Sequence, residues 1–379
     1  MRIAHDDRKQ PGLYRSPARC HAARAGIGKG EEMRRMLDGD VWRRPGRRLL
    51  QVLLAVSLSA ALLAFAACGD DEEEGGGGAG GGTAEQQTTK VKVGVLPISN
   101  VAPLYLGMQK GFFEEEGLEI EPAPAQSGNE IVTAMVSGDQ PFAFLGYVPA
   151  ASGRAQGLPI KLIANADNGA ETAKDEWTQL MVGKDSPIRD VKDLAGKTIA
   201  VNALKGVGEV VIKAALDKRG VDPNSIKLLE VPFPEMPAAL ERGRVDVIWA
   251  PEPFLTSVLG AGGREIEAPL TTLGPKYPNG TYAVNEQYLS ENEDVVERFA
   301  RAMNRSSDYA TENPDEARAT IPEFTQIPAD VAEKIRLPLW PTEIDREQLE
   351  QLIDYAVQYQ VIEEDKKPAL DELIWEGAG

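Results

Sequence analysis

The stretch VKVGVLPISNVAPLYLGMQKGFFEEEGLEIE, residues 91–121, determines the fold expected for this chain of 379 residues. Residues 91–96 predict a short strand, and residues 118–123 predict a second one. Between them, residues 103–110 predict a helix that ends at Gly111, because glycine often follows the last turn of a helix. A strand, a helix and a strand in succession are the repeating unit of an α/β fold.

The same alternation continues in both directions from this unit. Ser127 opens a helix that runs through Ser137 and closes at Gly138. Residues 292–379 are expected to be mainly helical, including 295–312 and 347–360. Mostly parallel sheets covered by helices are therefore expected. The other predicted strands are 142–145, 160–164, 180–182, 198–201, 226–230 and 245–249, and the other predicted helices are 149–155, 190–194, 208–219 and 236–242.

Two consecutive α/β units predict two lobes. We expect lobe 1 to comprise residues 90–180, lobe 2 residues 181–282, and the chain to return to lobe 1 with residues 283–379. Strands near 178–183 and 280–286 would join the lobes as a hinge. Ligands of open parallel sheets bind beyond the carboxyl ends of the strands, so facing lobes would place these ends across one cleft.

An export signal precedes this body. Residues 1–48 form an N-terminal extension with a cationic end, and residues 49–67 are uncharged and apolar, which is the layout of a signal peptide. The sequence Ala66-Ala67-Cys68 resembles a bacterial lipobox, although Phe65 stands where leucine is usual. This resemblance implies cleavage before Cys68 and attachment of a lipid to it. A retained membrane helix and export by the twin-arginine route, suggested by Arg47-Arg48, are the alternatives.

The segments around the signal are expected to carry no fold. Residues 1–32 are polar and lack apolar periodicity, and Met33 and Met36 offer later starts, so we interpret residues 1–32 as the result of a misassigned start codon or as a disordered extension. Residues 68–89 are acidic and then glycine-rich, a composition typical of disordered tethers.

Cleavage before Cys68 would change the chemistry of the chain. It would leave 312 residues, and it would remove 13 of the 41 basic and 6 of the 59 acidic side chains, which leaves 28 and 53 and a net charge of −25. Such an acidic chain is not expected to bind nucleic acid or an anionic membrane surface.

The same cleavage would remove both histidines, His5 and His21, and one of the two cysteines, Cys20. Cys68 would carry lipid, so neither histidine nor free thiol would remain. Ser-His-Asp and Cys-His catalysis, histidine-bound zinc and structural disulfides are thereby excluded. The composition favours a binding protein without a cofactor, since an enzyme would have only carboxylate, lysine or tyrosine chemistry.

Several segments together resemble one family. The opening stretch is followed in order by DLAGKTIAVN (193–202), PFPEMPAALERGRVDVIWAPEPF (232–254) and YAVNEQYL (282–289). This succession, over residues 90–375, resembles the binding proteins of ABC importers for nitrate, sulfonate, taurine and thiamine-pyrimidine precursors. The resemblance implies a two-lobed periplasmic-binding-protein fold of type II. It also implies an enzyme alternative, because pyrimidine-precursor synthases share this fold, but their histidine and cysteine-rich motif would be absent after cleavage.

Candidate ligand-binding residues of lobe 1 follow its predicted strands. Ser99 and Asn100 come directly after the first strand, although Asn and Pro are also common in simple turns. Ser127, Gly128 and Asn129 start a helix whose N–H groups could hold an anion or a carbonyl group, with ordinary N-capping as the alternative. Tyr147 follows the third strand and could stack on a planar ligand or lie at the edge of the core.

Candidate residues of lobe 2 occupy the matching positions. Asn202, Lys205, Gly206 and Gly208 precede a helix, and Lys205 could pair with an anionic ligand or be solvated. Glu252 lies between two prolines after the strand that ends at Trp249. Its carboxylate could accept N–H bonds from a ligand, or it could brace the hinge. Trp249 is assigned to the core.

The sequence therefore predicts a lipid-anchored solute-binding protein on the extracytoplasmic face of a bacterial plasma membrane. It would deliver a small molecule to the permease and ATPase of an ABC importer by closing its lobes. A ligand sensor and an enzyme are the alternatives. An anionic ligand and a ligand with N–H donors both remain possible, and the position of Glu252 slightly favours the second.

Overall fold

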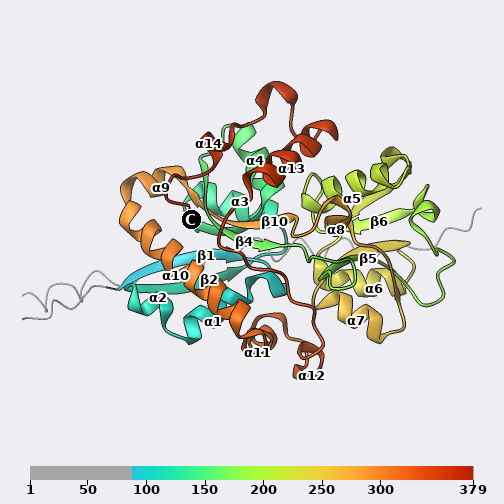
Figure 1. Cartoon of the computed structure of the whole chain (residues 1–379), viewed down its shortest axis with the longest axis horizontal. Coiled ribbons are helices and arrows are strands. Elements are labelled where there is room, and N and C mark those ends of the chain that lie inside the picture. The colour runs from blue at the N-terminus through green and yellow to red at the C-terminus, as the bar shows by residue number, and fades with distance from the viewer. Residues whose placement is uncertain (1–87, 379) are drawn as a thin grey trace, which may run out of the picture. The chain divides into compact units, whose positions relative to one another are not determined.

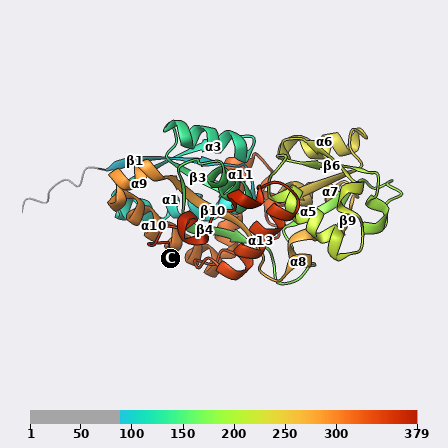
Figure 2. The same cartoon turned by 90° about the horizontal axis from the view of Figure 1, so that it is seen from above.

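The computed structural model describes residues 88–378 of the chain. The predicted signal segment, Cys68 and nearly all of the predicted tether lie outside these residues. Within residues 88–378, none of the helices combines the length and the apolar character that crossing a membrane requires. The described part forms two five-stranded sheets, each covered by helices (Figures 1 and 2).

The first sheet has the strand order β2-β1-β3-β10-β4. Strand β1 pairs in parallel with β2 on one side and with β3 on the other, as the opening stretch of the sequence predicts. Strand β10 is antiparallel to both of its neighbours, β3 and β4. The strands of this sheet are β1 (Thr89–Val95), β2 (Leu118–Pro124), β3 (Phe142–Gly146), β4 (Ile160–Asn168) and β10 (Pro278–Asn285).

The second sheet has the order β7-β6-β8-β5-β9. Strands β6, β7 and β8 are parallel, whereas β5 is antiparallel to both β8 and β9. The strands of this sheet are β5 (Thr178–Val182), β6 (Thr198–Val201), β7 (Lys227–Glu230), β8 (Val247–Pro251) and β9 (Arg264–Glu267).

Each sheet is thus mostly parallel, as predicted, with one antiparallel strand. That strand is in each case the first one the chain forms after it crosses from the other sheet: β5 follows β4, and β10 follows β9. The chain passes from β4 to β5 without a helix, whereas α8 (Pro269–Leu273) lies between β9 and β10. The residues predicted as a hinge, near 178–183 and 280–286, lie in or next to β5 and β10, whereas the chain passes between the sheets just before them, in residues 169–177 and 268–277.

Each helix belongs to the sheet whose strands precede it in the chain. Helices α1 to α4 follow the strands of the first sheet, α5 to α8 belong to the second, and the later helices return to the first (Figure 1). Their bounds are α1 (Ala102–Gln109), α2 (Phe112–Glu115), α3 (Gly128–Ser137), α4 (Tyr147–Ala155), α5 (Val207–Lys218), α6 (Met236–Glu241), α7 (Phe254–Gly260), α8 (Pro269–Leu273), α9 (Glu286–Glu291), α10 (Glu293–Glu312), α11 (Pro314–Thr325), α12 (Ala329–Ala332), α13 (Arg346–Gln358) and α14 (Leu370–Leu373).

Local sequence signals set several of these boundaries. The Ser127 side chain caps α3 by accepting a hydrogen bond from the Glu130 backbone N–H at 3.3 Å. Gly138 ends the same helix with a φ of 83°, a left-handed conformation that costs glycine little. Both ends of this helix are therefore confirmed as predicted.

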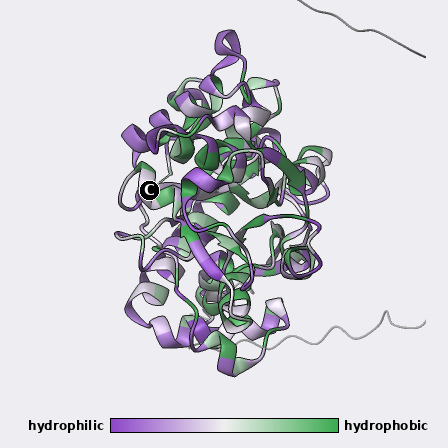
Figure 3. Ribbon diagram, turned by 90° about the vertical axis from the view of Figure 1, so that its right-hand side faces the viewer, coloured by the Kyte–Doolittle hydropathy of each residue, from purple (hydrophilic) through white to green (hydrophobic). Residues whose placement is uncertain are grey.

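Apolar residues gather along the strands and on the helix faces that cover them, with polar residues on the outer faces (Figure 3). In α5, Val210, Val211, Ala214 and Ala215 are buried, as predicted from their spacing. Burial of such side chains is the main contribution to the stability of the fold, about 25 cal/mol for each Å² of apolar surface.

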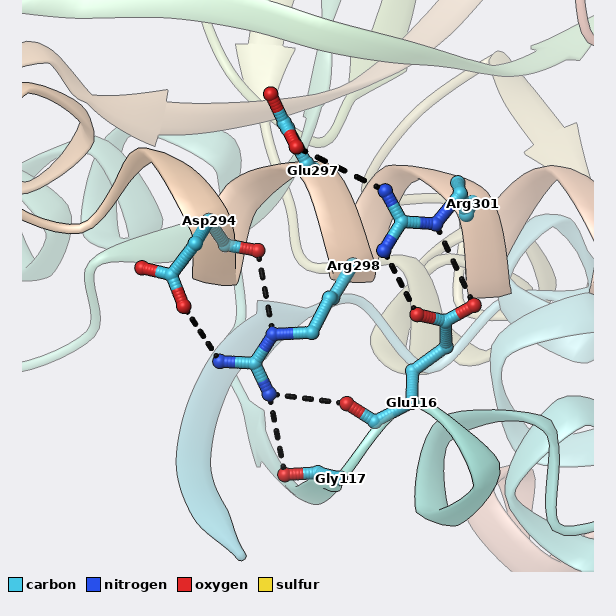
Figure 4. A network of polar contacts seen from close by, with 6 residues as sticks. All are labelled: Glu116, Gly117, Asp294, Glu297, Arg298 and Arg301. Carbon is cyan, nitrogen blue, oxygen red and sulfur yellow. Dashed lines mark hydrogen bonds and ion pairs between the residues drawn. The ribbon is translucent and has the colours of Figure 1, made fainter. Parts of the chain in front are cut away.

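The long helix α10 fixes the returning chain to the first sheet (Figure 4). Arg298 donates to the backbone carbonyl of Glu116 at 2.9 Å and pairs with Asp294 at the same distance. Arg301 pairs with the Glu116 side chain, also at 2.9 Å. These arginines hold the turn before β2 against α10, which joins residues about 180 positions apart in the chain.

Candidate functional site

A cavity lies between the two sheets. The empty space in and around it, including the part open to solvent, is about 500 Å³. Leu96, Gly128 and Phe144 line it from the first sheet and its helices, and Asn202 and Trp249 line it from the second. A molecule in this cavity would therefore touch both lobes.

The walls of the cavity are mainly apolar and aromatic. The apolar side chains with the largest surfaces come from both lobes: Phe144, Trp177, Phe233, Trp249, Ile98 and Pro251. Trp177 is fixed in place because its indole N–H donates to the Asn168 carbonyl at 3.0 Å. Aromatic walls of this kind suit a flat or apolar ligand body.

Three helices start at the cavity, and each brings a glycine to its wall. Gly128 is the first residue of α3, and Gly146 and Gly206 immediately precede α4 and α5. Neither Gly146 nor Gly206 has a side chain that could cap its helix, and Pro149 in the first turn of α4 has no N–H group. Three positive helix ends attract hydrogen-bond acceptors.

The polar side chains in the wall are Asn202 and Asn279. Among the residues that line this cavity, none is a lysine, an arginine or a histidine. An acceptor on the ligand would thus meet backbone N–H groups and amides, rather than the positive charge of a lysine or an arginine.

Three buried carboxyl groups lie directly behind the wall. Burial raises the pKa of Asp167 to about 7, and a hydrogen bond from Asn279 opposes this shift. Burial likewise raises the pKa of Glu176 to about 6 and that of Glu252 to about 7, in both cases against hydrogen bonds from neighbouring threonines. The surroundings of the cavity therefore disfavour additional negative charge.

The structure places the lobe 1 candidates at different depths. Gly128 lines the cavity, whereas Asn129 is exposed. Ser99 and Asn100 are buried in a short 3-10 helix (Ser99–Val101), and their side-chain polar atoms have no hydrogen-bond partner within the described structure. Ser127, as described above, caps α3.

Tyr147 is fully buried, and its hydroxyl donates to the Asn165 side chain at 2.7 Å. This matches the alternative in which Tyr147 belongs to the core. Burial raises the pKa of its hydroxyl well above the usual range, so it remains a neutral donor.

The lobe 2 candidates divide in the same way. Asn202 and Gly206 line the cavity. Lys205 is exposed and contributes to a separate surface depression beside α5. Gly208 provides room for an aromatic wall residue, because a Cβ atom there would lie 2.4 Å from Cε3 of Trp249.

Glu252 is buried and bonded within the protein. Its carboxylate accepts hydrogen bonds from the backbone N–H and the hydroxyl of Thr256, at 3.0 and 2.8 Å, and from the backbone N–H of Arg336 at 3.3 Å. The Glu252 carbonyl accepts from the Ser99 N–H at 3.1 Å, which joins the lobes. These contacts match the alternative in which Glu252 braces the hinge.

Sequence reasoning missed several residues of the site. Trp249, assigned to the core, is both buried and part of the wall. Trp177, Asn279, Asp167 and Arg336 were not singled out. Trp177 lies just before a predicted strand, and this position is a signal that could have identified it as a site residue. The roles of the other three residues depend on contacts between distant segments, which the sequence does not reveal. No group of His, Cys, Asp and Glu suited to a metal ion occurs in residues 88–378.

Comparison with known proteins follows this geometry. A family model described as "NMT1/THI5 like" matches residues 98–317, which is more than half of the chain. The chain is similar to a putative aliphatic sulfonates-binding protein of Bacillus subtilis (27% identity over 66% of this chain and 74% of that protein). It is also similar to the formylaminopyrimidine-binding protein of Halalkalibacterium halodurans (26% identity over 61% of this chain and 68% of that protein).

A solved structure confirms the fold. The alkanesulfonate-binding protein SsuA from Xanthomonas axonopodis pv. citri, bound to MOPS, superimposes with a TM-score of 0.64 at 17% identity, over 76% of this chain and 98% of that one. The periplasmic-binding-protein fold expected from the sequence is thus confirmed.

One relative is an enzyme. The chain is 24% identical to the 4-amino-5-hydroxymethyl-2-methylpyrimidine phosphate synthase of Aspergillus parasiticus, over 56% of this chain and 64% of that protein. The proteins similar to this chain therefore include solute-binding proteins and a synthase.

Proposed function

The chain belongs to the NMT1/THI5-like family, and from this premise we propose that it is the solute-binding protein of an ABC importer. Its ligand is a small molecule held in the cavity between the two sheets. The protein delivers this ligand to a permease that an ATPase drives. Relatives with binding-protein names support this proposal, as does the fold.

The observation that carries the proposal is the composition of the cavity wall. Gly128, Phe144 and Asn279 come from one lobe, and Asn202, Gly206 and Trp249 come from the other. A ligand that contacts both lobes binds the closed arrangement better than an open one, and so it shifts the population toward closure. A permease can then distinguish the loaded form from the empty one.

Contacts between the lobes support such a closed arrangement. Besides the Ser99–Glu252 hydrogen bond, Arg336 reaches from the segment between α12 and α13 to the second sheet, where it pairs with Glu265 at 2.5 Å. Ion pairs of this kind at partly exposed positions contribute about 1 kcal/mol or less. They can therefore break and re-form as the lobes move.

Small-angle X-ray scattering tests lobe closure. We expect the radius of gyration to decrease when a ligand found by a thermal-shift screen saturates the protein, because closure brings the two sheets together. The screen is sensitive enough, since a ligand at 100 times its Kd stabilises the native state by about 2.7 kcal/mol. Identical scattering with and without ligand, with binding confirmed by calorimetry, would contradict closure.

We also propose that Cys68 carries a lipid and holds the protein on the extracytoplasmic face of the membrane. Cys68→Ser should release the protein from membranes or leave it unprocessed, because serine cannot form the thioether. Fractionation of cells that express the full chain, with mass spectrometry of the N-terminus, measures this. Cys20→Ser, upstream of the predicted cleavage point, is the matched control and should stay membrane-bound. Unchanged membrane association of Cys68→Ser, with the signal removed and no lipid found, would refute the anchor.

A ligand sensor and a pyrimidine-precursor synthase are the competing functions. The three buried carboxyl groups near the cavity are held by internal hydrogen bonds, which supports binding over catalysis. Incubation of the protein with its ligand should leave the ligand unchanged, whereas turnover would establish the synthase alternative. Loss of uptake after deletion of a neighbouring permease gene would favour import over sensing.

A further inference from the structure

The end of β4 and the start of β10 meet at the cavity wall and form a built polar arrangement. Asp167 is fully buried on β4, and its Oδ2 accepts a hydrogen bond from Nδ2 of Asn279 at 2.9 Å. Asn279 is itself buried and lines the cavity. Asn279 lines the same cavity as the sequence candidates Gly128, Asn202 and Gly206, but neither Asp167 nor Asn279 is itself one of those candidates.

The backbone of β10 is shaped to allow this contact. The pairing of β10 with β4 is irregular between Pro278 and Gly280 and again between Gly280 and Thr281. Such bulges re-aim side chains at the edge of a site. A Cβ atom at Gly280 would lie 2.3 Å from Oδ1 of Asp167, so only glycine lets the carboxylate come this close to β10.

Asp167 determines what the Asn279 side chain offers to a ligand. The NH₂ end of the amide donates to Oδ2 of Asp167 at 2.9 Å, so this carboxyl oxygen holds that end in place. The other end of the amide, the carbonyl oxygen, is then the group left for a partner. An acceptor in the wall selects a ligand with an N–H donor and penalises one that lacks it.

The rest of the wall offers the opposite chemistry. The helix starts at Gly128, Gly146 and Gly206 supply donors for an acceptor on the ligand. The indole N–H of Trp249 is buried without a partner and belongs to the same wall. The ligand edge must therefore carry both acceptors and at least one donor, while the aromatic walls take a flat body.

Charge decides between an anion and a neutral molecule. No basic side chain lines the cavity, and Asp167, Glu176 and Glu252 are buried just behind its wall. An anion in the cavity would repel each of these carboxyl groups in its ionised form, in a poorly solvated region with no basic side chain in the wall to offset the repulsion. Helix ends alone, each equivalent to about half a charge, can serve carbonyl oxygens equally well.

We propose that the ligand is an uncharged flat heterocycle with an N–H donor and a C=O or ring-nitrogen acceptor on its edge, and that Asp167 selects for this donor by holding the Asn279 amide. The proposal rests on the solute-binding function proposed above. Asp167 acts through Asn279 and is a positioning residue.

Calorimetry with matched pairs of probes tests the proposal. Uracil and 1,3-dimethyluracil, xanthine and caffeine, and adenine and N6,N6-dimethyladenine differ in the N–H groups that methylation removes. We expect at least one parent heterocycle to bind, and its methylated partner to bind about tenfold more weakly or worse, because the acceptor of Asn279 then lacks a partner. Nitrate, taurine and ethanesulfonate should bind more weakly than the parent heterocycle.

Asp167→Asn tests the positioning role. The new amide can hold either end of Asn279, so the preference for the parent over the methylated probe should fall toward one. Asp308→Asn, at an exposed position on α10, is the matched control and should keep the preference. A retained preference in a folded Asp167→Asn protein overturns the role of Asp167. If that variant does not fold, Asn279→Ala takes its place, and a retained preference overturns the selection by this amide.

The outcomes separate this inference from the proposed function. Tight binding of an anion with lobe closure, or binding of no heterocycle in the panel while another ligand binds, overturns the ligand class but leaves the solute-binding function intact. If neither the heterocycles nor the anions bind or change the radius of gyration, the inference and the proposed function both fail.

Discussion

Gly146→Ala should weaken ligand binding by about tenfold or more while the protein remains folded. A Cβ atom at Gly146 would lie 2.5 Å from Cγ2 of Val207, which starts α5 in the other lobe. In an open form these two residues would separate, so this clash belongs to the closed form, whereas a milder contact of 3.3 Å with Cδ of Pro149 stays within one lobe. Overpacking costs about 1–3 kcal/mol, and this penalty is subtracted from the affinity for any ligand that requires closure.

Calorimetry on the variant measures this loss, and scattering shows whether saturating ligand still compacts the protein. Gly183→Ala is the matched control, because a Cβ atom there meets nothing within 4 Å. Val207→Ala removes the clashing methyl group and should restore binding in the double variant. Affinity of Gly146→Ala within threefold of wild type, with normal compaction, would show that these lobes do not meet at this point.

Glu252→Gln should make the protein more stable than wild type at about pH 8 but not at about pH 4.5. Burial raises the pKa of Glu252 to about 7 from its usual 4.5. Below pH 4.5 the group is protonated in the folded and the unfolded states alike. As the pH rises toward 7, the unfolded state loses the proton first, so the free energy of unfolding falls.

This rise in the pKa corresponds to a difference in the free energy of unfolding of roughly 3 kcal/mol between low and high pH. Arg336 is the charged neighbour of Glu252, and its attraction lowers the pKa and so limits the effect. Urea unfolding of both proteins across this pH range measures the difference. Glu333→Gln, at an exposed position, is the control. A stability difference between Glu252→Gln and wild type that stays constant from pH 4.5 to 8 would mean that Glu252 is ionised in the fold throughout.

The sequence predicts best where the deciding interactions are local. The helix from Ser127 to Gly138 has both ends as expected, because a serine cap and a left-handed glycine act within one turn of the chain. Strand β6 matches the predicted residues 198–201, and the predicted helix 295–312 differs from α10 only by two residues at its start. The alternation of such elements is sufficient for the fold class.

Strand β4 shows where local reasoning ends. The predicted strand stops at residue 164, because Asn165, Asp167 and Asn168 are residue types that strands disfavour. In the structure β4 continues to Asn168, since β10 pairs along its whole length. Asp167 was missed as a site residue for this reason: its partner Asn279 lies 112 positions away.

The candidate residues follow the same division. Chain position after a strand pointed to Gly128, Asn202 and Gly206, and these line the cavity. The same rule selected Tyr147, Lys205 and Glu252, which are not in the cavity wall. The Tyr147 hydroxyl donates to Asn165, and Lys205 is exposed. Glu252 accepts hydrogen bonds from Thr256 and Arg336. Position in the chain places a residue near the cleft, but the direction of its side chain depends on what packs around it.

The sequence by itself therefore determined the α/β class, the two-lobed fold and the absence of histidine chemistry after residue 21. Periodicity and capping depend on neighbouring residues, and composition depends on the complete sequence, so none of them requires tertiary contacts. Only the tertiary structure decided that β10 inserts antiparallel between β3 and β4, that aromatic residues of both lobes form one cavity, and that Asp167 holds Asn279. These features arise from contacts between segments far apart in the chain, whose pairing is selected by the packing of the entire core.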